Sequence, residues 1–210
     1  MNLLAVFPAF ALTALLLAMV PGQGVAMILR QSLVGGSRAA IYSVLGNSGG
    51  LMIWGAASAI GLSAVFASSP TAFSLLKWAG VIFLVGLSIQ TLLELRNKSG
   101  KFEVSGHAKT TFFPALRLGL ITNLTNVKAA VFAVAFIPQF VPKDFNLGWG
   151  IFILSCVQSL TSMVWYFSLI AAVDKSSAVL ARPKVRRILT GVSAGGILVL
   201  ALGLALSHPR

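Results

Sequence analysis

The chain has 210 residues, of which 57% are hydrophobic and 10% charged, whereas a soluble globular domain carries about 25% charged residues. A soluble fold could not cover its apolar surface with so few charges, so the composition predicts an integral membrane protein in contact with a lipid bilayer. The net charge of +12 does not indicate nucleic-acid binding, because the basic residues lie in short gaps between apolar runs and not on one solvated face.

The apolar runs predict an all-α protein of about six transmembrane helices in a single transmembrane domain, residues 1–210, since a spanning helix needs about 20 largely apolar residues. Residues 3–29 carry no charged side chain. They lack the basic start and the short apolar core of a signal peptide, so we expect them to form the first membrane helix. The other helices are expected at about 39–67, 73–95, 113–141, 147–173 and 188–207.

One sizeable polar segment divides the chain into two halves of three predicted helices. We expect repeat one at about 1–96, a cytoplasmic loop at about 97–111, and repeat two at about 112–210. Polar residues interrupt the first helix of each half, at 21–24 (Pro-Gly-Gln-Gly) and at 123–126 (Asn-Leu-Thr-Asn). Because three is an odd number, the halves would enter the membrane from opposite sides. This pattern predicts two inverted repeats with a binding site at the broken helices, as in secondary transporters.

The basic residues predict the orientation of the chain in the membrane. They gather in the first, third and fifth connections, which we therefore expect to be cytoplasmic, with both termini outside. These residues are Arg30, Arg38, Arg96, Lys98, Lys101, Lys109, Lys175, Arg182, Lys184, Arg186 and Arg187.

The first interruption contains Pro21, Gly22 and Gln23. Pro21 removes a backbone donor and Gly22 weakens the helix, so a second half-helix is expected to start here. Its free N–H groups and positive dipole end would suit a carboxylate, and Gln23 adds a neutral donor and acceptor. The alternative is a proline kink that only shapes packing.

Lys128 lies about a dozen residues inside the fourth apolar run, where an ammonium group costs about 2.5–3.5 kcal/mol to insert. Such a residue is expected to face the bundle interior or a cavity, grouped with the amides of Asn123 and Asn126. The alternative is that the helix starts late and Lys128 reaches the interface. Residues 129–141 would then be too short to span the membrane, which favours a buried lysine.

Further polar side chains inside predicted helices are Asn47 and Gln158, which are secondary candidates for the same substrate-binding site. The four acidic residues lie at helix ends or in loops. The chain has no His-Glu-x-x-His motif and no phosphate-binding glycine loop. We therefore expect no enzymatic activity, no cofactor and no bound metal, and transport would have to draw on a gradient.

Short motifs spread over nearly the whole chain resemble the LysE/RhtB family of bacterial amino-acid exporters. They are Ala-Met-Val-Pro-Gly at 18–22, Gly-Gly-Ser-Arg at 35–38, Lys-Trp-Ala-Gly at 77–80, Gly-Leu-Ile-Thr-Asn at 119–123, Asn-Val-Lys-Ala-Ala at 126–130 and Phe-Ile-Pro-Gln-Phe-Val at 136–141. The resemblance implies export of amino acids or their derivatives across the inner membrane, driven by the proton motive force. Its motif positions in this chain are Pro21, Gly22, Asn126 and Lys128.

Three positions depart from the pattern of that family. Gln23 replaces the second proline of Pro-Gly-Pro, and Val127 replaces the proline of Asn-Pro-Lys. Helix two has Ser-Gly-Gly-Leu at 48–51, where members often carry an acid. These departures favour an alternative, a non-transporting membrane partner or scaffold subunit that keeps the fold. Glycine pairs at spacing four, such as Gly191 with Gly195, allow close helix contact and a possible homodimer.

Overall fold

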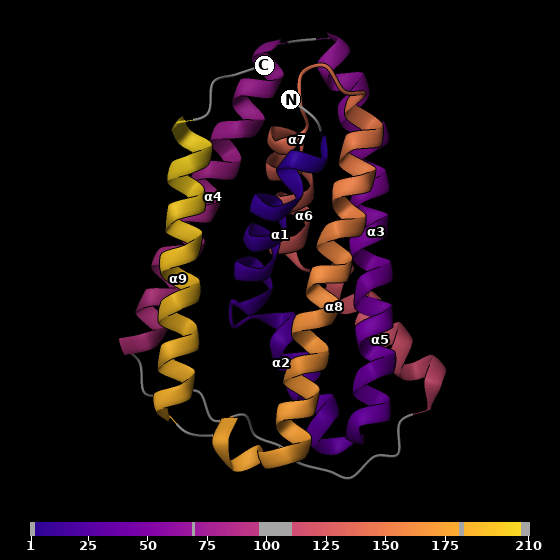
Figure 1. Ribbon diagram of the computed structural model, residues 1–210, viewed down its shortest axis with the longest axis vertical. Helices are drawn as coiled ribbons and strands as arrows, with labels where there is room; N and C mark the ends of the chain where they lie inside the picture. The colour runs from indigo at the N-terminus through magenta and orange to yellow at the C-terminus, as the bar shows by residue number, and fades with distance from the viewer. Residues whose placement is uncertain (1–2, 69, 97–110, 181–182, 207–210) are drawn as a thin grey trace.

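The computed structural model describes residues 3–68, 70–96, 111–180 and 183–206 (Figure 1). Within these ranges the protein is helical and has no strand, which confirms the predicted all-α class. Residues 97–110 of the predicted polar loop lie outside the described residues. The elements are α1 Leu3–Met19, α2 Gln23–Val34, α3 Gly36–Ser68, α4 Pro70–Arg96, α5 Phe112–Leu124, α6 Val127–Val131, the π-helix η1 Phe132–Phe136, α7 Ile137–Phe140, α8 Leu147–Leu180 and α9 Pro183–Leu206.

Each predicted apolar run corresponds to one helix or to one series of consecutive helices. Within the described residues, α8 is long and apolar enough over Leu147–Lys175 to cross a membrane as a single helix. Two bent pairs qualify when each is taken as one span, Leu3–Met19 with Gln23–Val34 (63°) and Phe112–Leu124 with Val127–Phe140 (59°). Length and composition thus give up to three spans, and the count of six stays a prediction.

The first break lies where the sequence predicts it, between α1 and α2. Pro21 has no N–H to continue the helix, and Gly22 takes an extended conformation (φ −172°, ψ −168°) as the residue before α2. The Gly22 carbonyl then accepts the first hydrogen bond of α2, from the N–H of Ala26 at 2.9 Å. The chain turns by 63° at this break, and the hydrogen-bonding pattern of α2 begins directly after it.

The second break, between α5 and α6, forms without the proline that the family pattern has there. Thr125 closes α5, donating from both its N–H (2.9 Å) and its hydroxyl (2.8 Å) to the Ile121 carbonyl. Asn126 then caps α6, its Oδ1 accepting from the N–H of Lys128 at 3.1 Å. An asparagine cap satisfies a donor that would otherwise stay open. The break therefore persists with Val127 in place of proline.

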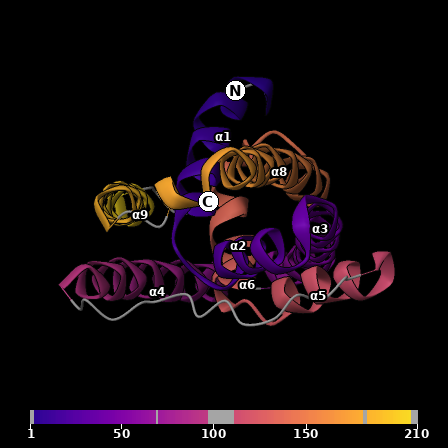
Figure 2. The same cartoon turned by 90° about the horizontal axis from the view of Figure 1, so that it is seen from below.

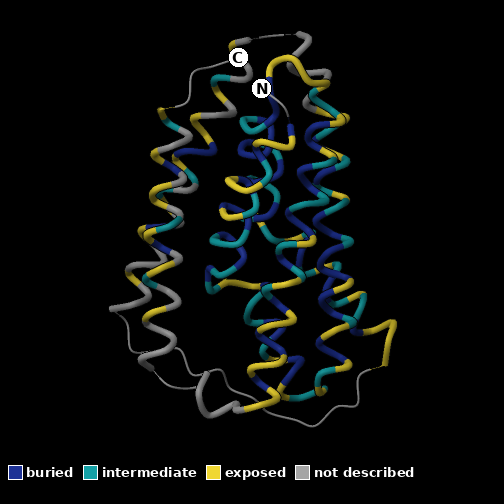
Figure 3. Tube along the Cα trace, viewed as in Figure 1, coloured by how far each residue is buried: buried dark blue, intermediate teal, exposed yellow. Residues whose placement is uncertain are grey.

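The two helix breaks lie in the middle of the bundle, whereas α5 lies at its outer edge beside α3 (Figures 1 and 2). The α1–α2 pair runs from the end of the molecule at which α9 finishes, whereas the α5–α7 series runs in the opposite direction (Figure 1). Around them, α3 packs against α5 and α8, and α4 packs against α9. Buried residues concentrate on the central elements and exposed ones on the outer faces (Figure 3).

The outer faces of the helices are apolar. Large hydrophobic side chains such as Leu12, Ile60, Ile82 and Phe113 are more than half exposed. The interior is apolar as well, with a cluster of aromatic rings formed by Phe132 and Phe136 of the π-helix together with Phe10 and Phe140. A protein that is apolar on both its inside and its outside needs lipid as its solvent.

Glycines allow α3 and α5 to approach at backbone distance. A Cβ added to Gly46 would clash with the Leu116 carbonyl, and one added to Gly119 would clash with the Ser43 carbonyl. A hydrogen bond at this crossing joins the Ser43 hydroxyl to the Ala115 carbonyl, at 3.1 Å. The contact brings Asn47 of α3 next to Asn123 of α5, and so assembles part of the site described below.

Candidate functional site

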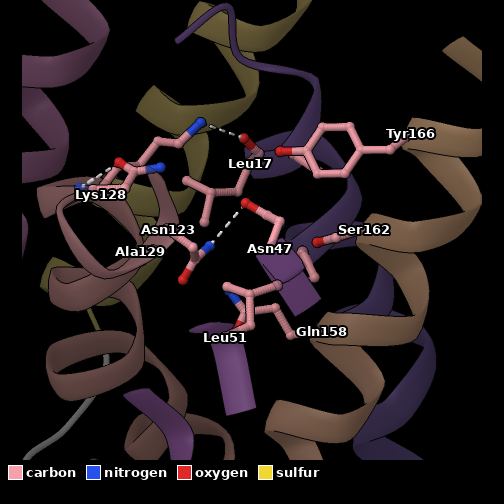
Figure 4. A pocket seen from close by; sticks show the side chains of 12 residues that line it. Leu17, Asn47, Leu51, Asn123, Lys128, Ala129, Gln158, Ser162 and Tyr166 are labelled. Carbon is pink, nitrogen blue, oxygen red and sulfur yellow. Dashed lines mark hydrogen bonds between the residues drawn. The ribbon is translucent and has the colours of Figure 1, made fainter. Parts of the chain in front are cut away.

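A small cavity lies beside the two helix breaks, between α1, α3, α8 and the junction of α5 with α6 (Figure 4). Its volume of about 20 Å³ holds about one water molecule, and is too small for an amino acid. The residues that line it are Ala14, Leu17, Ala18, Asn47, Leu51, Asn123, Asn126, Lys128, Ala129, Gln158, Ser162 and Tyr166.

Lys128 is the charged residue among those that line the cavity. Its half-buried side chain reaches from α6 to the end of α1, where Nζ donates to the carbonyls of Leu17 (3.0 Å) and Val20 (3.4 Å). The last carbonyls of a helix have no partner within it and form its negative end, so a cation is favourable there. Lys128 therefore links the two broken helices to each other at the point where each is interrupted.

A buried pair of amides lies next to Lys128 in the cavity wall. The Nδ2 atom of Asn123 donates to Oδ1 of Asn47 at 3.1 Å, and each residue is 2% exposed. Trp54 holds the backbone of the same segment, donating from Nε1 to the Asn123 carbonyl at 3.3 Å. The Oδ1 atom of Asn123 is buried and has no hydrogen-bond partner. One acceptor of the pair thus remains without a hydrogen-bond partner.

Helix α8 contributes a polar stripe on the other wall of the cavity, formed by Gln158, Ser162 and Tyr166. A spacing of four places these residues on one helix face, and all three are buried. The Oε1 atom of Gln158 has no hydrogen-bond partner. Tyr166 packs against the start of α2, so closely that a Cβ added to Gly24 would lie 2.6 Å from its hydroxyl oxygen.

The structure brings together Asn123, Asn126 and Lys128 with both secondary candidates, Asn47 and Gln158. The other three, Pro21, Gly22 and Gln23, form the first break and do not line the cavity. Gly22 and Gln23 are exposed. The break nevertheless adjoins the site, since a Cβ added to Gly22 would lie 3.8 Å from Nζ of Lys128.

Sequence reasoning missed Tyr166 and the apolar part of the lining. Tyr166 could have been found from its position eight residues after Gln158, because residues four apart lie on the same face of a helix. The apolar lining residues are small or aliphatic and resemble any other membrane-helix residues, so no sequence signal marks them. They are Ala14, Leu17, Ala18, Leu51 and Ala129.

The lining combines one ammonium group, neutral amides and hydroxyls, and small apolar side chains. It contains no carboxylate, and the described residues form no cluster of metal-ligating side chains. Such a site suits a small polar molecule with an anionic group. Broken helices that meet at an inward-facing polar site, inside a bundle with an apolar exterior, define a helical membrane protein of the transporter class.

Comparisons with known proteins identify the family. The LysE type translocator family matches residues 15–208. A homoserine/homoserine lactone efflux protein of Salmonella typhimurium is 31% identical over 204 residues, 96% of each chain. A threonine efflux protein of Escherichia coli (strain K12) is 26% identical over 193 residues, 88% of this chain and 86% of that protein. An uncharacterised membrane protein of Bacillus subtilis is 24% identical over 213 residues, 97% of each chain.

The chain therefore belongs to the LysE family of translocators. The predicted resemblance is confirmed, and so is the prediction of a membrane transport protein that is not an enzyme, because the members of this family are transporters. No solved structure matches the chain.

Proposed function

We propose that this protein is a secondary exporter of amino acids or their derivatives across the bacterial inner membrane, driven by the proton motive force. The observation that carries the proposal is the position of Lys128. Its ammonium group lies beside two buried amides at the meeting point of two broken helices. A polar site of this kind is what a transporter of zwitterions requires, and a packing role alone does not explain it.

Six transmembrane helices in two inverted three-helix repeats form the scaffold of this proposal. The two bent pairs open the two halves of the chain, bend by 63° and 59°, and run in opposite directions (Figure 1). Repeats related in this way place their broken helices side by side at the bilayer midplane. A multi-pass topology and an inner-membrane location are parts of the same proposal.

The proposed substrates are small amino acids and close derivatives. Two relatives are named as efflux proteins for homoserine, homoserine lactone and threonine, and we extend this substrate class to the present chain. The small lining residues Ala14, Ala18 and Ala129 favour a short side chain, because bulkier groups would meet the walls. In the proposed pose, Lys128 receives the substrate carboxylate next to Asn47, Asn123 and Asn126.

Because the cavity is small, the proposed transport cycle includes an opening of the site when substrate binds. A substrate carboxylate would replace the carbonyls of Leu17 and Val20 as the partner of Lys128. This exchange removes the contact between α1 and α6, so the two broken helices can separate and enlarge the site. Substrate binding would thereby favour the change of conformation that alternating access requires. Pro21, Gly22 and Gln23, at the first break, are the proposed hinge of this movement.

The test is counterflow in proteoliposomes with a panel of labelled amino acids, including threonine and homoserine. Wild type is expected to exchange at least one of them, and Lys128→Ala to reduce exchange about a hundredfold or more, because a charged hydrogen-bonding partner of the substrate is lost. Lys143→Ala is the matched control, since Lys143 is exposed and does not line the cavity. Membrane insertion of each variant is measured in parallel.

Unchanged exchange by correctly inserted Lys128→Ala protein would contradict the site assignment. Absence of exchange by wild type across the panel, with a pH gradient of either sign, would contradict export and support the alternative of a non-transporting partner subunit. The departures at Gln23 and Val127 that favoured this alternative leave both helix breaks in place.

A further inference from the structure

We infer that the amide oxygens of Gln158 and Asn123 form a subsite for the ammonium group of the substrate, on the Gln158 side of the Asn47–Asn123 pair. The inference rests on the proposed function and assigns the second half of the zwitterion. It also assigns a substrate-binding role to α8.

Two buried acceptors without partners carry the inference. Oδ1 of Asn123 and Oε1 of Gln158 are both unpaired, in residues that are 2% and 3% exposed. A buried polar atom without a partner costs free energy comparable to its lost hydration, and folded proteins contain few of them. Both atoms belong to residues that line the same cavity. A ligand that donates several hydrogen bonds would satisfy both, and an alkylammonium group carries three donors.

The arrangement separates the two charges of a zwitterion. Figure 4 shows the Asn47–Asn123 pair in the middle, with Lys128 on one side and Gln158 on the other. The carboxylate of the substrate is attracted to the Lys128 ammonium, whereas the substrate's own ammonium is repelled by it. Repulsion at one end and neutral acceptors at the other fix a single orientation of the ligand.

The remaining polar groups of α8 extend the subsite. Ser162 and Tyr166 follow Gln158 at steps of four on the same face, and their hydroxyl oxygens can accept a hydrogen bond as well as donate one. The lining residues include no carboxylate, so the ammonium would be held by dipoles alone. Dipoles without a counter-charge give weaker binding, and so permit release after each transport step.

The chemistry predicts which compounds the site accepts. An amino-acid methyl ester keeps the ammonium and loses the carboxylate, so it should still use the Gln158 end. An N-acetyl amino acid keeps the carboxylate and loses the ammonium, so it should use the Lys128 end alone. The two derivatives therefore report on the two halves of the cavity separately.

The experiment measures binding of L-threonine, its methyl ester and N-acetyl-L-threonine to the purified full-length protein in lipid nanodiscs by calorimetry. In Gln158→Leu, which removes the acceptor at similar volume, we expect about tenfold or greater loss of affinity for threonine and the methyl ester. Affinity for N-acetyl-threonine should not change. Gln31→Leu is the matched control, because Gln31 is a buried glutamine that does not line the cavity.

Gln158→Glu is the second variant, and keeps the inference testable if the leucine variant fails to fold. A carboxylate in place of the amide should strengthen binding of the methyl ester, because it supplies an opposite charge to the ammonium. An equal loss for all three ligands, no loss for any of them, or no binding of any of them to wild type would overturn the subsite. Counterflow by the same wild-type preparation tests export separately, so failure of transport and failure of the subsite are distinguishable.

Discussion

At the scale of single residues, the proposed function gives the Lys128 ammonium group two competing partners. Its Nζ atom donates to the carbonyls of Leu17 and Val20 at the end of α1, and the proposed substrate carboxylate would need the same donors. An ammonium group has three N–H donors, so some sharing is possible. Full engagement of a carboxylate nevertheless weakens the hold on α1. In the proposed cycle, this competition would let a residue that stabilises the resting structure also initiate its change.

Gly119 tests the close contact between α3 and α5. In Gly119→Ala, the added methyl group would meet the Ser43 carbonyl and the Asn47 backbone nitrogen, neither of which can move without shifting α3. Overpacking of this kind typically costs about 1–3 kcal/mol. We expect a lower midpoint of thermal unfolding in detergent and a weakened Asn47–Asn123 pair, measured as reduced substrate affinity.

Gly86→Ala provides the comparison for that substitution. Among the residues that the structure describes, nothing lies within 4 Å of a Cβ added to Gly86 in α4, and alanine favours helix over glycine by about 1 kcal/mol. This variant is expected to be as stable as wild type or more stable. Equal unfolding midpoints for the two variants would show that α3 and α5 do not meet at backbone distance.

At the scale of elements, both helix breaks have a geometry that accepts the prolines of the family pattern. Gln23 and Val127 are each the first residue of a half-helix, α2 and α6. The first N–H of a helix has no partner within that helix, and proline is favoured at this position. The residues before them, Gly22 (ψ −168°) and Asn126 (ψ 99°), are extended, as a residue before proline must be.

Gln23→Pro and Val127→Pro are therefore expected to stabilise the protein by about 0.4–1 kcal/mol each, since proline restricts the unfolded chain at a compatible site. Thermal unfolding in detergent measures this effect. Val131→Pro, at the end of α6 where it runs into η1, serves as the contrast. There proline removes a helix hydrogen bond and clashes with the preceding turn, which lowers the free energy of unfolding by about 3 kcal/mol or more. Destabilisation by the first two variants would mean that the breaks are not as described.

At the scale of the whole molecule, a contact between distant segments bears on the orientation of the chain. The hydroxyl of Ser37, at the start of α3, lies 2.5 and 2.7 Å from the two carboxylate oxygens of Asp174 in α8. The first and fifth connections therefore lie at the same end of the molecule. The basic residues predict that this end is cytoplasmic, and Arg38 and Lys175 are exposed there.

Thiol labelling in a Cys156→Ser background tests this orientation. A membrane-impermeant maleimide should label Lys143→Cys in intact cells, because Lys143 is exposed in the connection between α7 and α8. Arg38→Cys should react only after the cells are permeabilised. The reverse pattern would invert the topology, and labelling of both positions in intact cells would contradict a six-helix arrangement.

The predicted homodimer concerns the surface of the assembled molecule. Added Cβ atoms at Gly191 and Gly195 of α9 would meet nothing within 4 Å, so this face of the helix lacks close neighbours within the described protein. Association through it stays a prediction. Native mass spectrometry of the protein in nanodiscs measures the oligomeric state directly.

The sequence by itself determined the features that depend on local chemistry. Apolar length predicted each helical run, because lipid requires backbone groups to be satisfied within the helix. Pro21 and Gly22 predicted the first break, and Asn123 to Asn126 predicted the second, because these residue types interrupt or cap a helix whatever surrounds them. The cost of burying an ammonium group marked Lys128 as a residue that faces the interior.

Only the tertiary structure decided which of these features meet. It paired Asn47 with Asn123, brought Tyr166 to the cavity, and joined Lys128 to the carbonyls of Leu17 and Val20, 111 and 108 residues earlier in the chain. It also placed the exposed side chain of Gln23 outside the cavity lining. These outcomes depend on how α1, α3, α5 and α8 rotate and cross, and the crossings are set by contacts between segments far apart in sequence. Periodicity within one helix carries no information on that choice.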